Sequence, residues 1–321
     1  MRLLSPALIP SSLWDKTTES LQLPPCLSKA YVAYVDNLGL RKIGTTRSTD
    51  GGAVGGLSKE NADQHLAQCF DGSVARAMLA VLDPKNQGGM ASNTFIKSMA
   101  GSTLALTDAP CGAGAAALAF LSTIAELRAN AVLPRHPLEI KFIGGELSSH
   151  AVDHARKLFS DIQPELEAQA IFLDLKFKEW DVLDKLSNAD LVKESAVHGA
   201  SCSSKLLVIA NFNGFLVKER KQKEAQPQLD ELLRYASGEQ SLAVWIEPDM
   251  NRSAANGGLF SWLYQQMTTV WKRFAKIDPA ATSSEPVFRT SAKFSLPLQP
   301  TMFSRVSLAV MPIDLTRDAS K

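Results

Sequence analysis

The stretch "LTDAPCGAGAAALAFL", residues 106–121, decides how this chain folds. It runs from an apolar approach through an acidic residue, a Pro-Cys pair and two glycines into an alanine-rich segment. A glycine-rich turn between a strand and a helix brings backbone N–H groups close to a ligand, because no Cβ stands in the way. The stretch therefore predicts a ligand-binding turn, in which Cys111 is either a nucleophile or a residue that only shapes the turn.

The segments on both sides of this turn alternate between short apolar runs and helical patterns. Strands are predicted at 102–108, 138–146, 173–181, 205–212 and 241–247, with helices at 112–130, 149–160, 182–195 and 225–236. This alternation is typical of a parallel sheet that is covered on both faces by right-handed crossovers. Two further runs, 286–298 and 301–313, adjoin without a helix and predict an antiparallel hairpin at the sheet edge. The predicted fold is a doubly wound, mostly parallel, seven-stranded α/β sheet.

The first hundred residues lack this alternation. The Gly/Ser/Thr-rich segment 45–61 predicts a loop, and it is no phosphate loop because no Gly-Lys-Ser/Thr follows its glycines. Residues 60–83 and 91–100 carry helical patterns. We therefore predict a mainly helical N-terminal extension or cap at 1–100 and a Rossmann-like domain at 101–321.

Composition narrows the possible functions. Lys+Arg 34 against Asp+Glu 33 leaves a net charge of +1, which gives no support for a strongly basic nucleic-acid binder and leaves only local basic patches. The four cysteines are scattered, so no metal site is predicted. His150 and His154 stand four residues apart without a third ligand, which predicts solvated positions. No run approaches the roughly 20 apolar residues of a membrane span. A soluble, cytoplasmic protein is expected.

Five strand–helix steps, a terminal hairpin and the motif "DAPCGAG" together resemble the class I S-adenosylmethionine-dependent methyltransferases. The resemblance covers about residues 100–313. It implies S-adenosylmethionine as the cofactor and methyl transfer to an acceptor (small molecule, RNA or protein) that the sequence does not specify. It also implies that Asp108, Gly112 and Gly114 surround the amino-acid end of the cofactor, with Cys111 contributing mainly its backbone.

The later strand ends extend the resemblance. Glu146, with Leu147, stands where a carboxylate accepts both ribose hydroxyls. Asp181 and Val182 match the position beside the adenine amino group, and Asn211 and Phe212 the position beside the methyl group. The cofactor-binding residues that the resemblance implies are Asp108, Cys111, Gly112, Gly114, Glu146, Leu147, Asp181, Val182, Asn211 and Phe212.

The residues after the fourth predicted strand depart from a related pattern. Amino-methyltransferases of nucleic acid bases carry Asp/Asn/Ser-Pro-Pro-aromatic after the fourth strand, whereas this chain has Asn-Phe-Asn-Gly at 211–214. The absence of prolines argues against N6-adenine or N4-cytosine methylation. Glu247, in "IEP" after the fifth strand, either lines the substrate side or caps the next segment.

Three other interpretations use the same residues. "DAPC" also occurs in RNA cytosine-5 methyltransferases, where the cysteine attacks the base, but there it lies on the fourth strand. A nicotinamide-dependent oxidoreductase would tolerate Ala117 as the third fingerprint residue, yet Glu146 follows Gly114 by 32 residues, against about 20 in that fingerprint. A catalytically inactive methyltransferase-like assembly or regulatory module is the third.

Overall fold

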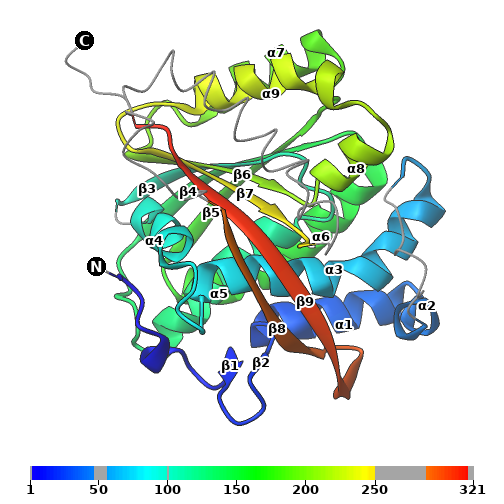
Figure 1. Cartoon of the computed structure of the whole chain (residues 1–321), viewed down its shortest axis with the longest axis vertical. Helices are drawn as coiled ribbons and strands as arrows, with labels where there is room; N and C mark the ends of the chain where they lie inside the picture. The colour runs from blue at the N-terminus through cyan, green and yellow to red at the C-terminus, as the bar shows by residue number, and fades with distance from the viewer. Residues whose placement is uncertain (1, 47–55, 100, 250–286, 317–321) are drawn as a thin grey trace.

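The structure is a computed structural model that describes residues 2–46, 56–99, 101–249 and 287–316 (Figure 1). It contains a nine-stranded sheet in the order β1-β2-β8-β9-β7-β6-β3-β4-β5, with helices on both faces. The elements are η1 (Pro6–Leu8), β1 (Trp14–Asp15), β2 (Ser20–Leu21), α1 (Pro25–Asn37), α2 (Arg41–Thr45), α3 (Lys59–Leu82), α4 (Gly89–Ser98), β3 (Thr103–Asp108), α5 (Ala115–Ala129), β4 (Leu138–Glu146), α6 (Ser149–Ala168), β5 (Ile171–Glu179), α7 (Lys185–His198), β6 (Ser204–Ala210), α8 (Asn213–Lys218), α9 (Gln222–Ala236), β7 (Ser241–Glu247), β8 (Phe288–Leu296) and β9 (Gln299–Asp314).

The predicted α/β architecture is confirmed. Strands β5, β4, β3, β6 and β7 are parallel neighbours, and each predicted strand lies within two residues of an observed one. Their registers align the carboxyl ends, since Asp108 lies opposite both Gly144 and Val208, and Ala210 lies opposite Ile246. The residues that follow these strands therefore meet at one edge of the sheet.

The predicted strand number and the position of the hairpin were wrong. The hairpin does form, but β9 lies antiparallel between β7 and β8 rather than at the edge. The sheet has nine strands instead of seven, because β1 and β2 from the N-terminal segment pair beyond β8. Each is only two residues long, too short for any alternation of polar and apolar residues to show in the sequence.

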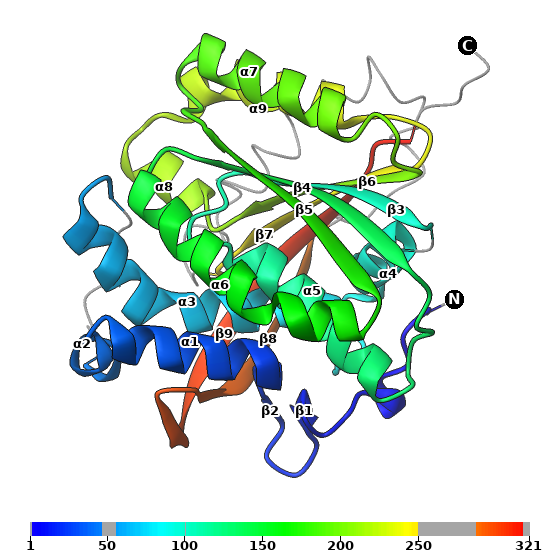
Figure 2. The same ribbon diagram turned by 180° about the vertical axis from the view of Figure 1, so that it is seen from behind.

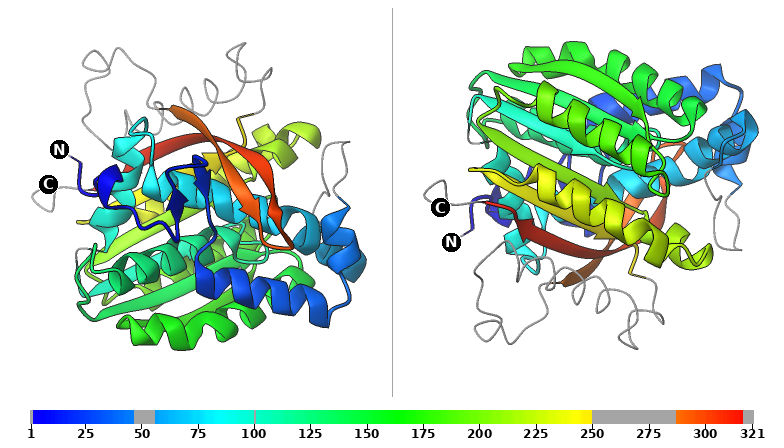
Figure 3. Two further views of the ribbon diagram at one scale, coloured as in Figure 1. Left: turned by 90° about the horizontal axis from the view of Figure 1, so that it is seen from below. Right: turned by 90° about the horizontal axis from the view of Figure 1, so that it is seen from above.

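Two helix layers enclose the sheet (Figures 2 and 3). Helices α1, α3, α4, α5 and α6 contribute to the larger hydrophobic core on one face, and α7, α8 and α9 contribute to the smaller core on the other. Helix α5 is apolar around nearly its whole circumference, as expected of a helix buried between a sheet and other helices. Every helix in the described ranges is too short or too polar to span a bilayer.

Local capping fixes where the helices after β4 and β5 begin. The Ser148 side chain accepts a hydrogen bond from the Ala151 N–H at the start of α6, and Asp184 accepts one from Leu186 at the start of α7. Helix α3, predicted at 60–83, runs from Lys59 to Leu82. Of the loop predicted at 45–61, residues 47–55 lie outside the described residues.

Candidate functional site

The glycine-rich turn after β3 is held to the neighbouring strand by its backbone. The Cys111 N–H donates to the carbonyl of Gly145 at 2.9 Å, and the Gly114 N–H donates to the carbonyl of Cys111 at 2.8 Å. The Ala109–Pro110 peptide bond is cis. The turn thus leaves the sheet beside the end of β4 and enters α5 at Ala115.

Gly112 and Gly114 both have positive φ angles, of 52° and 79°, which glycine adopts without strain. Their surroundings differ. Among the described residues, apart from Gly112 and its chain neighbours, no atom lies within 4 Å of the place where a Cβ of Gly112 would stand, whereas a Cβ of Gly114 would meet Phe159 at 3.0 Å and Leu118 at 3.2 Å. Gly112 therefore borders open space that a ligand could enter, and Gly114 permits close packing of α5 on α6.

Glu146 at the end of β4 faces this turn. Its Oε2 accepts the Gly112 N–H at 2.9 Å, and its Oε1 accepts the Ser148 N–H at 2.9 Å. Burial raises the pKa of this carboxyl, and the two N–H groups act in the opposite direction. The carboxylate thus joins the glycine turn to the start of α6, with lone pairs left for further donors.

Asp108, the last residue of β3, is completely buried. Within the described part of the chain, neither carboxylate oxygen accepts a hydrogen bond of normal geometry, and the Ala117 N–H lies near enough to favour the charged form. Desolvation, with a smaller contribution from the charge of Glu146, raises the pKa of Asp108 to about 8. A cationic group placed beside this carboxyl would supply the missing partner.

Cys111 is buried in the turn, with its Sγ 2.8 Å from where a Cβ of Gly144 would stand. Desolvation, followed by the charges of Asp108 and Glu146, raises the pKa of this thiol well above its ordinary value. A nucleophilic cysteine needs the opposite shift. The side chain therefore has a packing role in the turn.

The residues after β5 lie at the same edge of the sheet. The Asp181 Oδ1 accepts the Leu183 N–H at 2.8 Å, and the Asp181 N–H donates to Ser187 Oγ at 2.9 Å. Val182 is buried in the smaller core with Trp180, whereas Leu147, after β4, is exposed. The side chain of Asp181 is thus held in place by a hydrogen bond within the turn that it begins.

Asn211 and Phe212 follow β6. Asn211 has a positive φ of 56°, and its Oδ1 accepts a hydrogen bond from Arg76 Nη1 at 2.5 Å. The Phe212 ring is buried, 5.8 Å from the Trp180 ring and 6.0 Å from the Phe215 ring between centroids. The Phe212 side chain is therefore packed into the smaller core, and its backbone lies at the site.

Glu247 at the end of β7 is buried and organises the loop after β6. Its Oε1 accepts hydrogen bonds from the Phe212 N–H at 3.0 Å, the Asn213 N–H at 2.9 Å and Trp245 Nε1 at 2.8 Å. Burial raises the pKa of this carboxyl, and these three donors oppose the shift. The sequence left open whether Glu247 lines the substrate side or caps a segment. Its contacts are those of a cap, because it accepts N–H groups at the start of α8.

Arg76 is the site residue that sequence reasoning missed. It lies on α3, far from the strand ends in sequence, and its Nε donates to the Ser307 carbonyl on β9 at 3.1 Å. Burial lowers the pKa of Arg76 to about 10, and the charge of Glu247 opposes that shift. Nothing in the pattern of α3 distinguishes this arginine from a solvated helix residue.

The prediction that His154 is solvated was wrong. His154 is buried, its Nδ1 lies 2.9 Å from the Tyr34 hydroxyl on α1, and its Nε2 lies 3.0 Å from Asp63 Oδ1 on α3. The N-terminal helices cover α6 and enclose this side chain, which the local sequence did not indicate. Within the described ranges, no cluster of three metal-ligating side chains is found.

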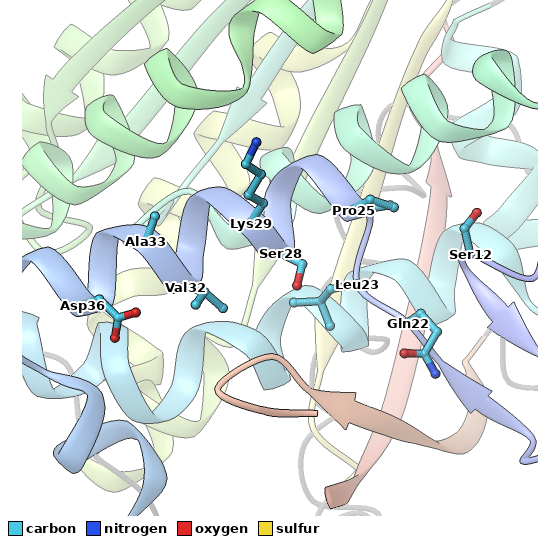
Figure 4. Close-up of a pocket in the computed structure, with 9 residues that line it drawn as sticks. All are labelled: Ser12, Gln22, Leu23, Pro25, Ser28, Lys29, Val32, Ala33 and Asp36. Atoms are coloured by element: carbon cyan, nitrogen blue, oxygen red, sulfur yellow. The ribbon is translucent and has the colours of Figure 1, made fainter. Parts of the chain in front are cut away.

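A pocket of about 710 Å³ opens beside α1 and is separate from the strand ends (Figure 4). It is lined by Ser12, Gln22, Leu23, Pro25, Ser28, Lys29, Val32, Ala33 and Asp36. None of these residues belongs to the cluster described above.

No protein-family model matches this sequence. No curated protein matches it either. Among solved structures, the chain is similar to the precorrin-6y C5,15-methyltransferase of Geobacter metallireducens, with 10% identity, 68% of this chain and 86% of that chain covered, and a TM-score of 0.33. It is similar to a Listeria monocytogenes protein assigned to the class I S-adenosylmethionine-dependent methyltransferases, with 12% identity, 93% and 88% covered, and a TM-score of 0.36. It also matches the Pichia pastoris phosphofructokinase in the T-state, with 10% identity, 88% and 98% covered, and a TM-score of 0.33.

Scores this low do not establish a shared fold. The class of the protein follows instead from the strand order and directions, which define a Rossmann-like α/β fold with its candidate site at the carboxyl ends of the parallel strands. The five parallel strands and the hairpin after them agree with what the sequence resemblance to class I methyltransferases implied, whereas the nine-strand sheet does not.

Proposed function

We propose that this protein is an S-adenosylmethionine-dependent methyltransferase that binds its cofactor at the ends of β3, β4 and β5. The observation that carries the proposal is the pairing of an open glycine turn with two carboxyls on adjacent strands. Asp108 is buried without a hydrogen-bond partner of normal geometry among the described residues, which suits a cationic amino group. Glu146 keeps lone pairs for the hydroxyls of a ribose.

The remaining residues would orient the cofactor. Gly112 borders open space in which the amino-acid end could lie without meeting a side chain. Asp181 and Val182 stand at the end of the next strand, where the adenine would lie. Asn211 lies one residue beyond β6, which is the neighbour of β3, so the acceptor would approach there.

When bound, S-adenosylmethionine supplies a methyl group on a sulfonium, which a lone pair of the acceptor attacks in line, leaving S-adenosylhomocysteine. This chemistry needs no protein nucleophile. The chain's contribution is positioning and exclusion of water, effects that can account for a large part of a rate enhancement. A protonated Cys111 thiol is consistent with that role.

The test is calorimetric titration of the full chain with S-adenosylmethionine and S-adenosylhomocysteine. We expect binding to the wild type and a roughly tenfold or greater loss of affinity in Glu146→Gln, because a charged hydrogen-bond acceptor is lost. The matched control is Glu139→Gln, an exposed glutamate near the opposite end of the same strand, which should bind like the wild type. Absence of heat and of thermal stabilisation at millimolar ligand would refute the proposal, and heat with NADH instead would favour an oxidoreductase.

One observation favours the non-catalytic alternative. Glu247, the carboxylate whose charge raises the pKa of Arg76, already accepts three hydrogen bonds on one oxygen and is a poor candidate for a general base. A methyltransferase-like assembly or regulatory module would bind the cofactor without turnover. Methyl incorporation from labelled S-adenosylmethionine into any extract fraction would eliminate this alternative.

A further inference from the structure

We propose that Arg76 binds an oxyanion of the methyl acceptor at the ends of β6 and β7, so that the acceptor is an anionic molecule. This inference rests on the proposed function, because it assigns the substrate class of the same site. It gives the N-terminal segment a direct part in the site through α3 (Figure 1).

The side chain of Arg76 is anchored by two of its three nitrogens. Nη1 donates to Asn211 Oδ1 at 2.5 Å and Nε donates to the Ser307 carbonyl at 3.1 Å. These contacts join α3 to the residue after β6 and to β9. Over the described part of the chain, Nη2 has no hydrogen-bond partner, so the guanidinium is fixed in place with donors to spare.

The charge of Arg76 is only partly neutralised. Burial disfavours the guanidinium cation, yet it stays protonated at neutral pH because the pKa of Arg76 falls only to about 10. No carboxylate of the described residues forms an ion pair with it, and Glu247 acts from a longer distance while its Oε1 holds three N–H groups. A partly buried, preoriented guanidinium binds carboxylate or phosphate oxygens strongly.

A second observation concerns the surface beside Arg76. A polar pocket of about 480 Å³ adjoins the same point of β9 and carries three cations, Lys85, Arg289 and Arg305, against one carboxylate, Asp249. Ser307 lines this pocket and connects Arg76 to it. Its carbonyl accepts a hydrogen bond from Arg76, and its hydroxyl donates to the Asp249 carbonyl at 3.2 Å. The excess of positive charge favours an anionic molecule here.

A direct test uses nuclear magnetic resonance of the arginine side chains in the full chain. The probes are inorganic phosphate and acetate, titrated separately at constant ionic strength, with and without S-adenosylhomocysteine. We expect the Arg76 Nε–H signal, assigned by its loss in Arg76→Lys, to shift saturably with one of the two anions, which also tells a phosphate from a carboxylate acceptor. No shift with either anion would overturn the inference.

The control in the same spectra is Arg128. Arg128 lies in the last turn of α5, at the opposite end of that helix from the glycine turn; it is buried, and its Nη1 donates to the backbone carbonyls of Gln169, at 2.8 Å, and Ala170, at 3.3 Å. The Arg128 signal should not respond to either anion. An equal response of both arginines would indicate non-specific ion binding and would also overturn the inference.

The turnover test compares variants in the transfer of labelled methyl groups to extract fractions. Arg76→Gln should lose roughly tenfold or more of the transfer, as expected for a charged hydrogen bond, while its affinity for S-adenosylhomocysteine stays unchanged. Arg76→Lys should recover part of it, and Arg128→Gln should transfer like the wild type. Undiminished transfer by Arg76→Gln overturns the inference. Failure of the wild type to bind S-adenosylhomocysteine overturns the proposed function instead, and the anion titration without that ligand still tests Arg76.

Discussion

Gly112 and Gly114 belong to one turn, yet the structure gives them different tasks. The turn motif was recognisable because glycines between a strand and a helix have a physical reason to be there. Which glycine borders open space and which one packs against Phe159 depends on how α6 lies against α5. Gly112 is therefore expected to matter for ligand binding, and Gly114 for the stability of the fold.

We predict that the two alanine substitutions have different effects. Each substitution should lower the free energy of unfolding by roughly 1–2 kcal/mol, because alanine must adopt a positive φ. Gly112→Ala adds a methyl group in open space, so its melting temperature should fall only by this backbone contribution, with loss of S-adenosylhomocysteine binding. Gly114→Ala should melt markedly lower still, because its methyl group also meets Phe159 and Leu118. Thermal unfolding and calorimetry measure the two effects. Unchanged binding by Gly112→Ala would contradict the proposed role of that residue.

Asp108 yields a prediction in which stability and binding move in opposite directions. Its ordinary pKa of 3.8 is raised to about 8 in the folded chain. Between these values the folded state holds a proton that the unfolded state lacks, so this group makes stability fall as pH rises. Asp108→Asn should therefore unfold at a higher temperature than the wild type near pH 8, with little difference below pH 4, and should bind S-adenosylhomocysteine poorly.

Melting curves across that pH range, with calorimetry near pH 8, measure both consequences. The control is Asp153→Asn, since Asp153 is an exposed residue on α6 that should shift neither. An Asp108→Asn variant that is less stable than the wild type near pH 8 would contradict the account of its burial.

At the scale of elements, the contact between α3 and α6 shows what a helical pattern leaves open. His154 lies between Tyr34 of α1 and Asp63 of α3, and Lys59 pairs with Asp63 from the same helix. The sequence predicted a helix at 149–160, but three separate helices had to pack before this histidine became buried.

We predict that His154 weakens the fold in acid. Desolvation lowers the pKa of His154 below its ordinary 6.5, with Asp63 opposing this shift and Lys59 adding to it. The unfolded chain therefore takes up a proton before the folded chain does, and this contribution to stability is lost as pH falls through about 6.5. His154→Gln should show a smaller drop in melting temperature between about pH 7.5 and 5.5 than the wild type. An identical drop in both proteins would exclude His154 as the titrating group.

At the scale of the whole molecule, the N-terminal segment and the sheet share one hydrophobic core. Leu66, Phe70, Val74 and Met78 of α3 are at most 2% exposed and lie in the same core as α5 and β9. We propose a division of the chain at residue 100 into a cap and a Rossmann-like domain. Because the two parts share a core, this division can be tested by separating them.

We predict that residues 101–321 alone do not fold. Burial of four large apolar side chains contributes about 1.5–3 kcal/mol each, together comparable with the roughly 5–15 kcal/mol that stabilises a typical protein. The fragment should lack a cooperative thermal transition. Co-expression with residues 1–100 as a separate chain should restore it, which distinguishes lost packing from damage at the new terminus. A cooperative transition in the fragment alone would show that the cap is dispensable.

The sequence by itself determined the alternation of strands and helices, the glycine turn and the acidic strand ends, because these depend on periodicity and backbone conformation within short windows. Only the tertiary structure decided that β1 and β2 extend the sheet, that Cys111 and His154 are buried, and that Arg76 lies against Asn211 and Ser307. These features arise from contacts between segments far apart in the chain. Burial and charge pairing at a residue are set by the neighbours that packing supplies, and no local pattern around that residue specifies them.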